Sequence, residues 1–217
     1  MQKRFNFSSN GLLEINLSLN ATVNILQSKD GTRYLDLEIN AENGDKIKIE
    51  ESSNFLKISH LANIELSDFL HTIVDVFSDK KTSAIKHFEE MAQESIPARV
   101  TLFTTIDSDL DLKLNSGVVV CDCVLNGFKH KQNSGKFQLN KACKIFDLKM
   151  NNGLINLNAD KTVDKWDIKM NNGSIEIKKS DFTGSIIEKN GSKKIQSTGL
   201  GNKYIELKIN NGNVIVV

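Results

Sequence analysis

The chain has 217 residues, of which 39% are hydrophobic and 25% charged, with a single proline. This length and composition predict one sizeable folded domain and exclude a disordered tail. With 28 basic and 27 acidic residues the net charge is +1, so no broad field favours nucleic acid, and no nucleic-acid partner is expected. No apolar run approaches the roughly 20 residues of a membrane-spanning helix.

The start of the chain and its cysteines predict a compartment. Lys3 and Arg4 are followed by polar residues that interrupt any apolar stretch, so no secretory signal peptide is expected. The chain has three cysteines, Cys121, Cys123 and Cys143. This number is odd and too low for a disulfide framework. We therefore expect a cytoplasmic protein, with cell-surface display by a route without a signal peptide as the alternative.

Residues 1–66 show strand-like alternation with irregular spacing. Apolar residues alternate with polar ones over 12–17, 22–25, 34–39 and 46–49, and Asp30-Gly31 and Asn43-Gly44 mark turns. Terminal units of repeat proteins are atypical because they cover an open end. Residues 1–66 are therefore interpreted as an atypical β capping region.

Residues 67–96 change to a helical period. Ser67 can cap a helix whose apolar residues fall at 69, 70, 73, 74 and 77, and a second set falls at 84, 85, 88, 91 and 92, before Pro97. The spacing predicts a short helical hairpin inserted into a β body. Its apolar face is expected to pack on that body; the alternative is a docking helix for a partner or a membrane surface.

Residues 97–217 form an internal repeat. The segment Phe146–Gly153 recurs almost unchanged as Trp166–Gly173, and equivalent units centre on six glycines 18 to 21 residues apart. Apolar residues alternate on both sides of each glycine, which indicates strands with one buried face. The units at Gly135 and Gly191 depart from the pattern and are interpreted as irregular. The predicted turn residues are Asn115, Gly117, Asn133, Gly135, Asn151, Gly153, Asn171, Gly173, Asn190, Gly191, Asn210 and Gly212.

Two all-β architectures fit this repeat. In a β-solenoid, each unit of about 19 residues is one coil stacked about 4.8 Å above the last. In an antiparallel hairpin meander or β-sandwich, each Asn-Gly makes a tight hairpin turn. The asparagine two places before five of the glycines favours the solenoid, because stacked coils would align these amides into a ladder. Lys189 is the exception to this column.

The repeat carries a resemblance to a known family. The run Asp147–Leu157 and its copies, preceded by Asn54–Ile58, resembles the bacterial β-strand-repeat family known as putative adhesins of unknown function. The resemblance covers about residues 20–217 without the helical segment, and its motifs are turn chemistry and alternation. It implies a β-solenoid-like body and, in some relatives, a role in cell-envelope stress of the daptomycin-response type. No catalytic residue or cofactor is carried over from it.

Two surface features are candidate binding sites. Lysines recur four places before the repeat glycines and could bind an anionic polymer, although such columns are commonly solvated and paired with neighbouring acids. This lysine stripe consists of Lys113, Lys131, Lys149, Lys169 and Lys208. The final strand offers an association edge, because an open solenoid end leaves backbone groups unpaired. That edge consists of Val214, Ile215, Val216 and Val217.

Catalytic and metal chemistry are not expected. Asp147 and Asp167 would lie about 5 Å apart on adjacent coils, near the spacing of a retaining glycosidase pair. Each has a lysine two residues later, which keeps it ionised and unable to donate a proton. The four histidines, His60, His71, His87 and His130, are too scattered to form a metal site.

The sequence thus predicts a non-catalytic β-repeat interaction protein without a cofactor, linked by resemblance to envelope stress or adhesion. Its expected partners are proteins, or further copies of itself at the last coil. A cytoplasmic self-assembling scaffold is the alternative, and a polysaccharide-active β-helix enzyme is a weaker one.

Overall fold

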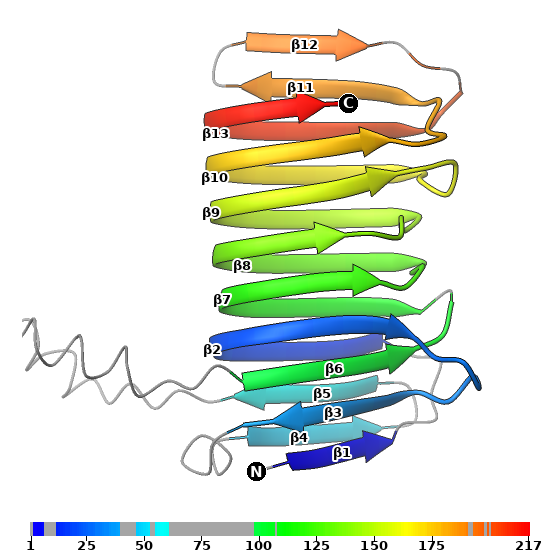
Figure 1. Ribbon diagram of the computed structural model, residues 1–217, viewed down its shortest axis with the longest axis vertical. Coiled ribbons are helices and arrows are strands. Elements are labelled where there is room, and N and C mark those ends of the chain that lie inside the picture. Colours follow the sequence, from blue (N-terminus) through cyan, green and yellow to red (C-terminus); the bar gives the residue numbers. More distant parts are fainter. Residues whose placement is uncertain are drawn as a thin grey trace, which may run out of the picture.

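The computed structural model describes residues 2–6, 12–39, 47–52, 55–60, 98–106, 108–190, 193–197, 199 and 201–217. These residues form strands, turns and loops and contain no helix, so the all-β prediction is confirmed. The predicted helical hairpin at 67–96 lies outside the described residues. Figure 1 shows the strands piled into one elongated column.

The strands pair into one large sheet that does not close on itself. Its elements are β1 (Gln2–Asn6), β2 (Leu12–Gln27), β3 (Tyr34–Glu38), β4 (Ile47–Ser52), β5 (Phe55–His60), β6 (Ala98–Thr104), β7 (Asp109–Asp122), β8 (Gly127–Leu139), β9 (Ile145–Ala159), β10 (Lys165–Lys179), β11 (Ser185–Asn190), β12 (Lys193–Ser197) and β13 (Tyr204–Val216). The main path runs β1-β3-β6-β2-β7-β8-β9-β10-β13-β11-β12, with β4 and β5 on a branch from β2.

Each long repeat strand bends at its glycine into two arms, which Figure 1 shows one in front of the other. We call the residues before the glycine the first arm and those after it the second arm. Both arms pair in parallel with the same arms of the neighbouring strand, so that Gly135 lies opposite Gly117 and Gly153. This parallel register contradicts the hairpin meander, in which the two halves of one unit would pair antiparallel.

The bend requires glycine. Gly117, Gly135, Gly153, Gly173 and Gly212 have φ between 127° and 148°, a region that side chains make unfavourable. A Cβ at Gly153 would also overlap the carbonyl oxygen of Gly135 in the strand below. The same overlap recurs along the column, so close stacking and the bend both select glycine.

The apolar residues of both arms point into a shared interior. Trp166, Phe146 and Phe137 are almost fully buried there, with ring centroids of neighbours 5.4 to 5.7 Å apart. The unit at Gly135, expected to be irregular, keeps the register, but it places the polar side chains of His130 and Gln132 in this interior. Both side chains are hydrogen-bonded within it.

The unit at Gly191 was expected to be irregular, and its strands β11 and β12 lie elsewhere in the stack than the order of the repeats suggests; Gly191 itself lies outside the described residues. The unit was expected to lie between the units of Gly173 and Gly212, but β13 pairs directly with β10 and β11 lies beyond β13. Ile186 lies opposite Ile205, two residues away from the expected alignment. After Asn190 the chain turns back as β12, antiparallel to β11. A second arm would have placed Lys193 at an interior position, where burying its charge is costly.

The other end of the column is closed by strands from far apart in the sequence. In β2, which has no glycine, residues 12–17 take the place of the first arm and residues 21–27 that of the second. Residues 12–17 pair with β5, which pairs with β4, and residues 21–27 pair with β6, which is followed by β3 and β1. The opposite edge of β2 pairs with β7 along both arms. Thus β2, which falls in the segment interpreted as a cap, stacks directly on the repeat strands.

Candidate functional site

The asparagines before the repeat glycines form a hydrogen-bonded ladder. Each side-chain amide donates to the side-chain oxygen of the strand below, at 2.8 Å from Asn133 to Asn115 and 2.9 Å from Asn171 to Asn151. Asn151 and Asn210 continue the series. A second ladder joins Asn152, Asn172 and Asn211. Five of the six asparagines predicted at the turns therefore bind one another, which gives them a structural role. The sixth, Asn190, donates to the backbone carbonyl of Gly212 at 3.0 Å instead.

The lysine stripe is largely paired with acids. Lys113 lies 3.3 Å from Glu14, Lys169 lies 2.6 Å from Asp167, and Lys149 and Lys208 also lie within 4 Å of acids. Lys131 has no ion pair with the described residues. Four of the five positive charges are thus offset locally, which leaves little attraction for an anionic polymer.

The carboxylate pair considered for catalysis is brought together as expected. Asp147 and Asp167 lie opposite each other on β9 and β10. Each binds the lysine two residues later through one oxygen, at 3.7 Å from Lys149 and 2.6 Å from Lys169. The other oxygen of each aspartate is buried without a hydrogen-bond partner. Neither aspartate lines either of the two hollows described below.

His130 forms the centre of a buried polar pair. Its Nδ1 lies 3.0 Å from the Leu112 carbonyl, and its Nε2 lies 2.9 Å from the Gln132 side-chain oxygen. Gln132 in turn donates to the carbonyl oxygens of Gly117 and Ser134. Burial lowers the pKa of His130 more than these hydrogen bonds raise it. The pair is enclosed by protein, so it fills the interior rather than contacting a ligand.

The cysteines are also interior residues. All three are free and buried, and burial raises the pKa of Cys121 to about 12 and that of Cys123 to about 11. Such thiols are weak nucleophiles and weak metal ligands. Within the described part of the chain, no group of three histidine, cysteine or acidic side chains could hold a metal ion.

The predicted association edge lies at an end that is only half covered. The first arm of β13 pairs with β11, but among the described residues its second arm pairs only with β10. Val216 points to the interior and is 38% exposed, whereas its equivalents on the lower strands, Leu157 and Ile177, are 4% and 0% exposed. Ile215 and Val217 are exposed on the outer side. We call residues 213–217 the open edge.

Two hollows that sequence reasoning missed lie on the outer face of the sheet. The larger, about 640 Å³, is near the N-terminus, across β1, β3, β6 and β2. It is lined in part by Arg4, which donates through Nε and Nη2 to the two carboxylate oxygens of Asp36. The smaller, about 390 Å³, crosses β8, β9 and β10. Their outward residues differ from strand to strand, so the repeat gave no signal for them.

Comparisons with known proteins give a likeness in structure alone. No protein-family model and no curated protein matches the sequence. Among solved structures, a putative cell adhesion protein from Clostridium sporogenes is 14% identical, with a TM-score of 0.48 over 100% of this chain and 97% of that one. A putative adhesin from Bacteroides fragilis is 11% identical, with a TM-score of 0.44 over 100% and 96%.

A third solved structure, a putative lipid binding protein from Parabacteroides distasonis, is 12% identical, with a TM-score of 0.32 over 100% and 96% of the two chains. TM-scores below 0.5 at these identities assign no function to the present chain. As for membranes, none of the residues described belongs to a helix of the length and apolarity needed to cross a bilayer.

Proposed function

We propose that this chain is a non-catalytic β-solenoid whose open edge takes up an extended segment of a partner protein. The observation that carries the proposal is the exposure of Val216, because its equivalents on the strands below are covered by the next strand. A strand added beside residues 213–217 would bury this valine and continue the interior column.

The backbone of the open edge is suited to such pairing. Val217 donates to the carbonyl of Ile177 at 2.9 Å, and its own carbonyl accepts from Lys179 at 2.7 Å, so both groups face β10. Alternate residues of a strand direct their backbone groups to opposite neighbours. The backbone groups of Val214 and Val216 therefore point away from β10, along the sheet, where they have no strand to pair with among the described residues.

The residue types in the four edge segments also differ. Charged residues discourage pairing at an edge. They occur on β1 (Lys3, Arg4), on β4 (Lys48, Glu50, Glu51) and on β12 (Lys193, Lys194). Residues 213–217 carry none, and four of the five are aliphatic. The open edge is the one of these four that lacks this protection.

The unequal heights of the first-arm and second-arm sides favour a separate segment over a second copy. Beyond β13 the first-arm side carries two more strands, β11 and β12, and so projects by roughly 10 Å. Two copies end to end with their first-arm sides aligned would meet at these projections before their open edges could pair. A copy turned so that its β12 lies beside the open edge would present a strand with Lys193 and Lys194, and charged edge strands disfavour pairing. A copy presenting β1 would project by one strand only, because β6, β3 and β1 stand against β5 and β4. The second-arm side, which is shorter by two strands at the open edge, would then keep a gap one strand wide between the two copies.

A peptide with the chain's own second-arm sequence tests the proposal. In the folded protein, Gly173–Lys179 of β10 pairs with the covered edge of β13. A fluorescent peptide of the same sequence should therefore bind the open edge, and its fluorescence anisotropy should rise on binding. Val216→Pro removes an outward backbone donor while sparing the bonds to β10, and should weaken binding at least about tenfold, or 1.4 kcal/mol. Ile215→Thr, which changes only the outer face, is the matched control.

Two outcomes would refute strand addition. One is equal binding by the Val216→Pro protein, and the other is equal binding of a peptide whose two isoleucines are replaced by lysine. Purified protein that forms concentration-dependent dimers abolished by Val216→Pro would instead support the self-assembling scaffold.

The cellular setting is part of the same proposal. The resemblance to putative adhesins supports a role at the bacterial envelope or in its stress response, and the three free cysteines are compatible with a reducing cytoplasm. Protease treatment of intact cells followed by fractionation distinguishes the two settings. Digestion would support surface display, and full protection in the soluble fraction would support the cytoplasmic assignment.

A further inference from the structure

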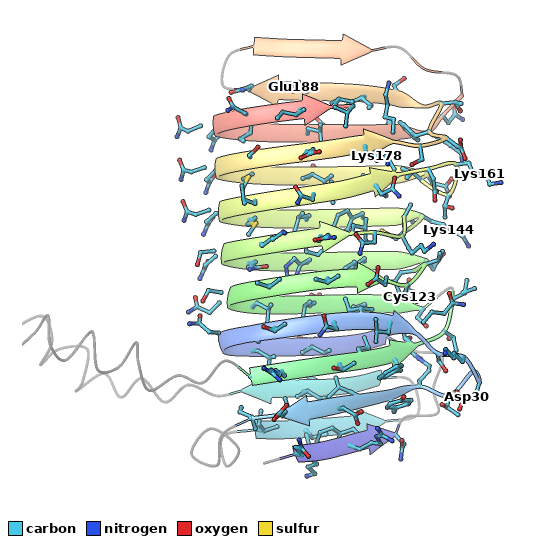
Figure 2. All side chains as sticks on the ribbon, in the orientation of Figure 1. Asp30, Cys123, Lys144, Lys161, Lys178 and Glu188 are labelled. Atoms are coloured by element: carbon cyan, nitrogen blue, oxygen red, sulfur yellow. The ribbon has the colours of Figure 1, made fainter. Side chains whose placement is uncertain are left out.

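The smaller hollow has a lining of amides and charges on a rigid support. It lies on the outer face of the second arms of β8, β9 and β10, whose backbones are paired with neighbours on both sides. The outward side chains are Gln138 and Asn140, Asn156 and Asn158, and Glu176 and Lys178. Figure 2 shows Lys178 on the second arm of β10. Gln138, Asn156 and Glu176 lie side by side in one row across the three strands.

Hydrogen bonds fix the orientation of half of this lining. Gln138 donates to the side-chain oxygen of Asn140 at 2.8 Å, and Asn140 donates to Asp122 at 2.6 Å. Asn158 accepts from Ser180 at 2.7 Å and donates to the Asn140 carbonyl. These amides are thus held in place before any ligand binds, which reduces the loss of side-chain conformational entropy on binding.

The remaining groups are unused. Among the described residues, the side chains of Asn156, Glu176 and Lys178 have neither a hydrogen bond nor an ion pair. The first arms show that this is not a consequence of spacing. An acid followed two residues later by lysine forms an ion pair there at Asp167–Lys169 (2.6 Å), and also at Asp147–Lys149 and Glu206–Lys208. Glu176 and Lys178 have the same spacing and remain apart.

We propose that this hollow binds a neutral polysaccharide chain laid across the strands. A sugar hydroxyl is both a donor and an acceptor, so it needs both kinds of partner close together. The hollow offers the ammonium of Lys178, the whole amide of Asn156 and the carboxylate of Glu176, with no net charge between them. Leu154, 52% exposed and two residues before Asn156 on the same face, can contact the C–H groups of a sugar ring.

Other ligand classes fit less well. A peptide strand finds no free backbone here, because both neighbours of β9 are already paired with it. A polyanion would need clustered cations, and the lining has one lysine beside one glutamate. Hydrolysis of the glycosidic bond needs two carboxyl groups, whereas Glu176 is the one carboxylate that lines the hollow. The site therefore fits binding without cleavage.

Titration by two-dimensional amide NMR tests the proposal on the whole protein. The probes are hexamers of glucose and of N-acetylglucosamine, both neutral, and a hexamer of galacturonate, which is anionic. Binding of a neutral hexamer should shift the side-chain amide signals of Gln138, Asn156 and Asn158. Asn156→Ala and the double variant Glu176→Ala with Lys178→Ala should each weaken it at least tenfold, with unchanged urea midpoints.

The matched control removes the same pair of charges from the other face. Asp167→Ala with Lys169→Ala should leave neutral-sugar binding unchanged. Equal weakening by this control, binding of the galacturonate hexamer alone, or no shift with either neutral hexamer would overturn the proposal. Displacement of the hexamer by the Gly173–Lys179 peptide would assign the hollow to peptides instead. Val216→Pro should leave sugar binding intact, so failure at the open edge and failure here are distinguishable.

Discussion

Replacing Gly153 by alanine should be strongly destabilising, because two independent costs meet at this residue. Its φ of 140° is accessible to glycine and strained for alanine, at about 1–3 kcal/mol. The new Cβ would in addition overlap the carbonyl oxygen of Gly135. The backbone cannot move away freely, because β9 is paired with β8 and β10 on its two sides. Together these terms predict a loss of about 3 kcal/mol or more.

Urea unfolding followed by tryptophan fluorescence measures this loss. Trp166 is the only tryptophan and is fully buried next to Phe146, so its emission reports the interior. With a slope of about 3 kcal/mol per molar urea, the midpoint should fall by about 1 M. Gly31→Ala is the control: its φ is 77°, and a Cβ there meets nothing within 4 Å, so about 1 kcal/mol is expected. Equal losses at Gly31 and Gly153 would refute the stacking argument.

Three further predictions concern the interior and the ladder. Burial lowers the pKa of His130, so at acidic pH the unfolded chain binds a proton that the folded chain does not, and the free energy of unfolding should fall as the pH drops below about 6.5. In urea titrations at pH 7 and pH 5, the double variant His130→Leu with Gln132→Met should lose part of this pH dependence. An unchanged pH dependence would contradict the reasoning. Asn151→Ala breaks two ladder hydrogen bonds and Asn210→Ala breaks one, so calorimetry should show about 1–2 kcal/mol lost for the first and about half of that for the second. The buried thiols of the three cysteines, with their raised pKa values, should resist iodoacetamide at pH 8 until urea is added, and rapid labelling of the folded protein, seen by mass spectrometry, would contradict their burial.

The regular part of the fold could be predicted because it repeats. Alternation around Gly153 and Gly173 specified two arms with one buried face, and the asparagine before each glycine specified the ladder. The unit at Gly191 was expected to be irregular, but its place in the stack could not be predicted from its Asn-Gly pair. Lys193 at the next interior position was the available signal that the second arm would not form, and the chain there forms β12 instead.

Other features depend on partners far away in the sequence. The pairing of β2 with β7 joins Ala21 to Gly117, and no local pattern marks this match. The hollows could not be predicted for a related reason. In the smaller one, Gln138, Asn156 and Glu176 occupy equivalent positions on three strands but differ in residue type. A repeat reveals positions where the strands agree, whereas the linings of these hollows arise where the strands differ.

Along a strand such as β10, the inward residues that repeat should determine stability, and the outward residues that vary should have little effect on it. On β10, Ile175 and Ile177 point inward and are fully buried, while Glu176 and Lys178 alternate with them on the outer face. Inward changes should lower the urea midpoint through lost packing, by about 1 kcal/mol for Ile177→Val. Changes at Glu176 and Lys178 remove no hydrogen bond or ion pair with the described residues and should leave the midpoint unchanged. If Glu176→Ala lowered the midpoint as much as Ile177→Val, then the outer row would be part of what holds the strands together, and its side chains would not be free to meet a ligand.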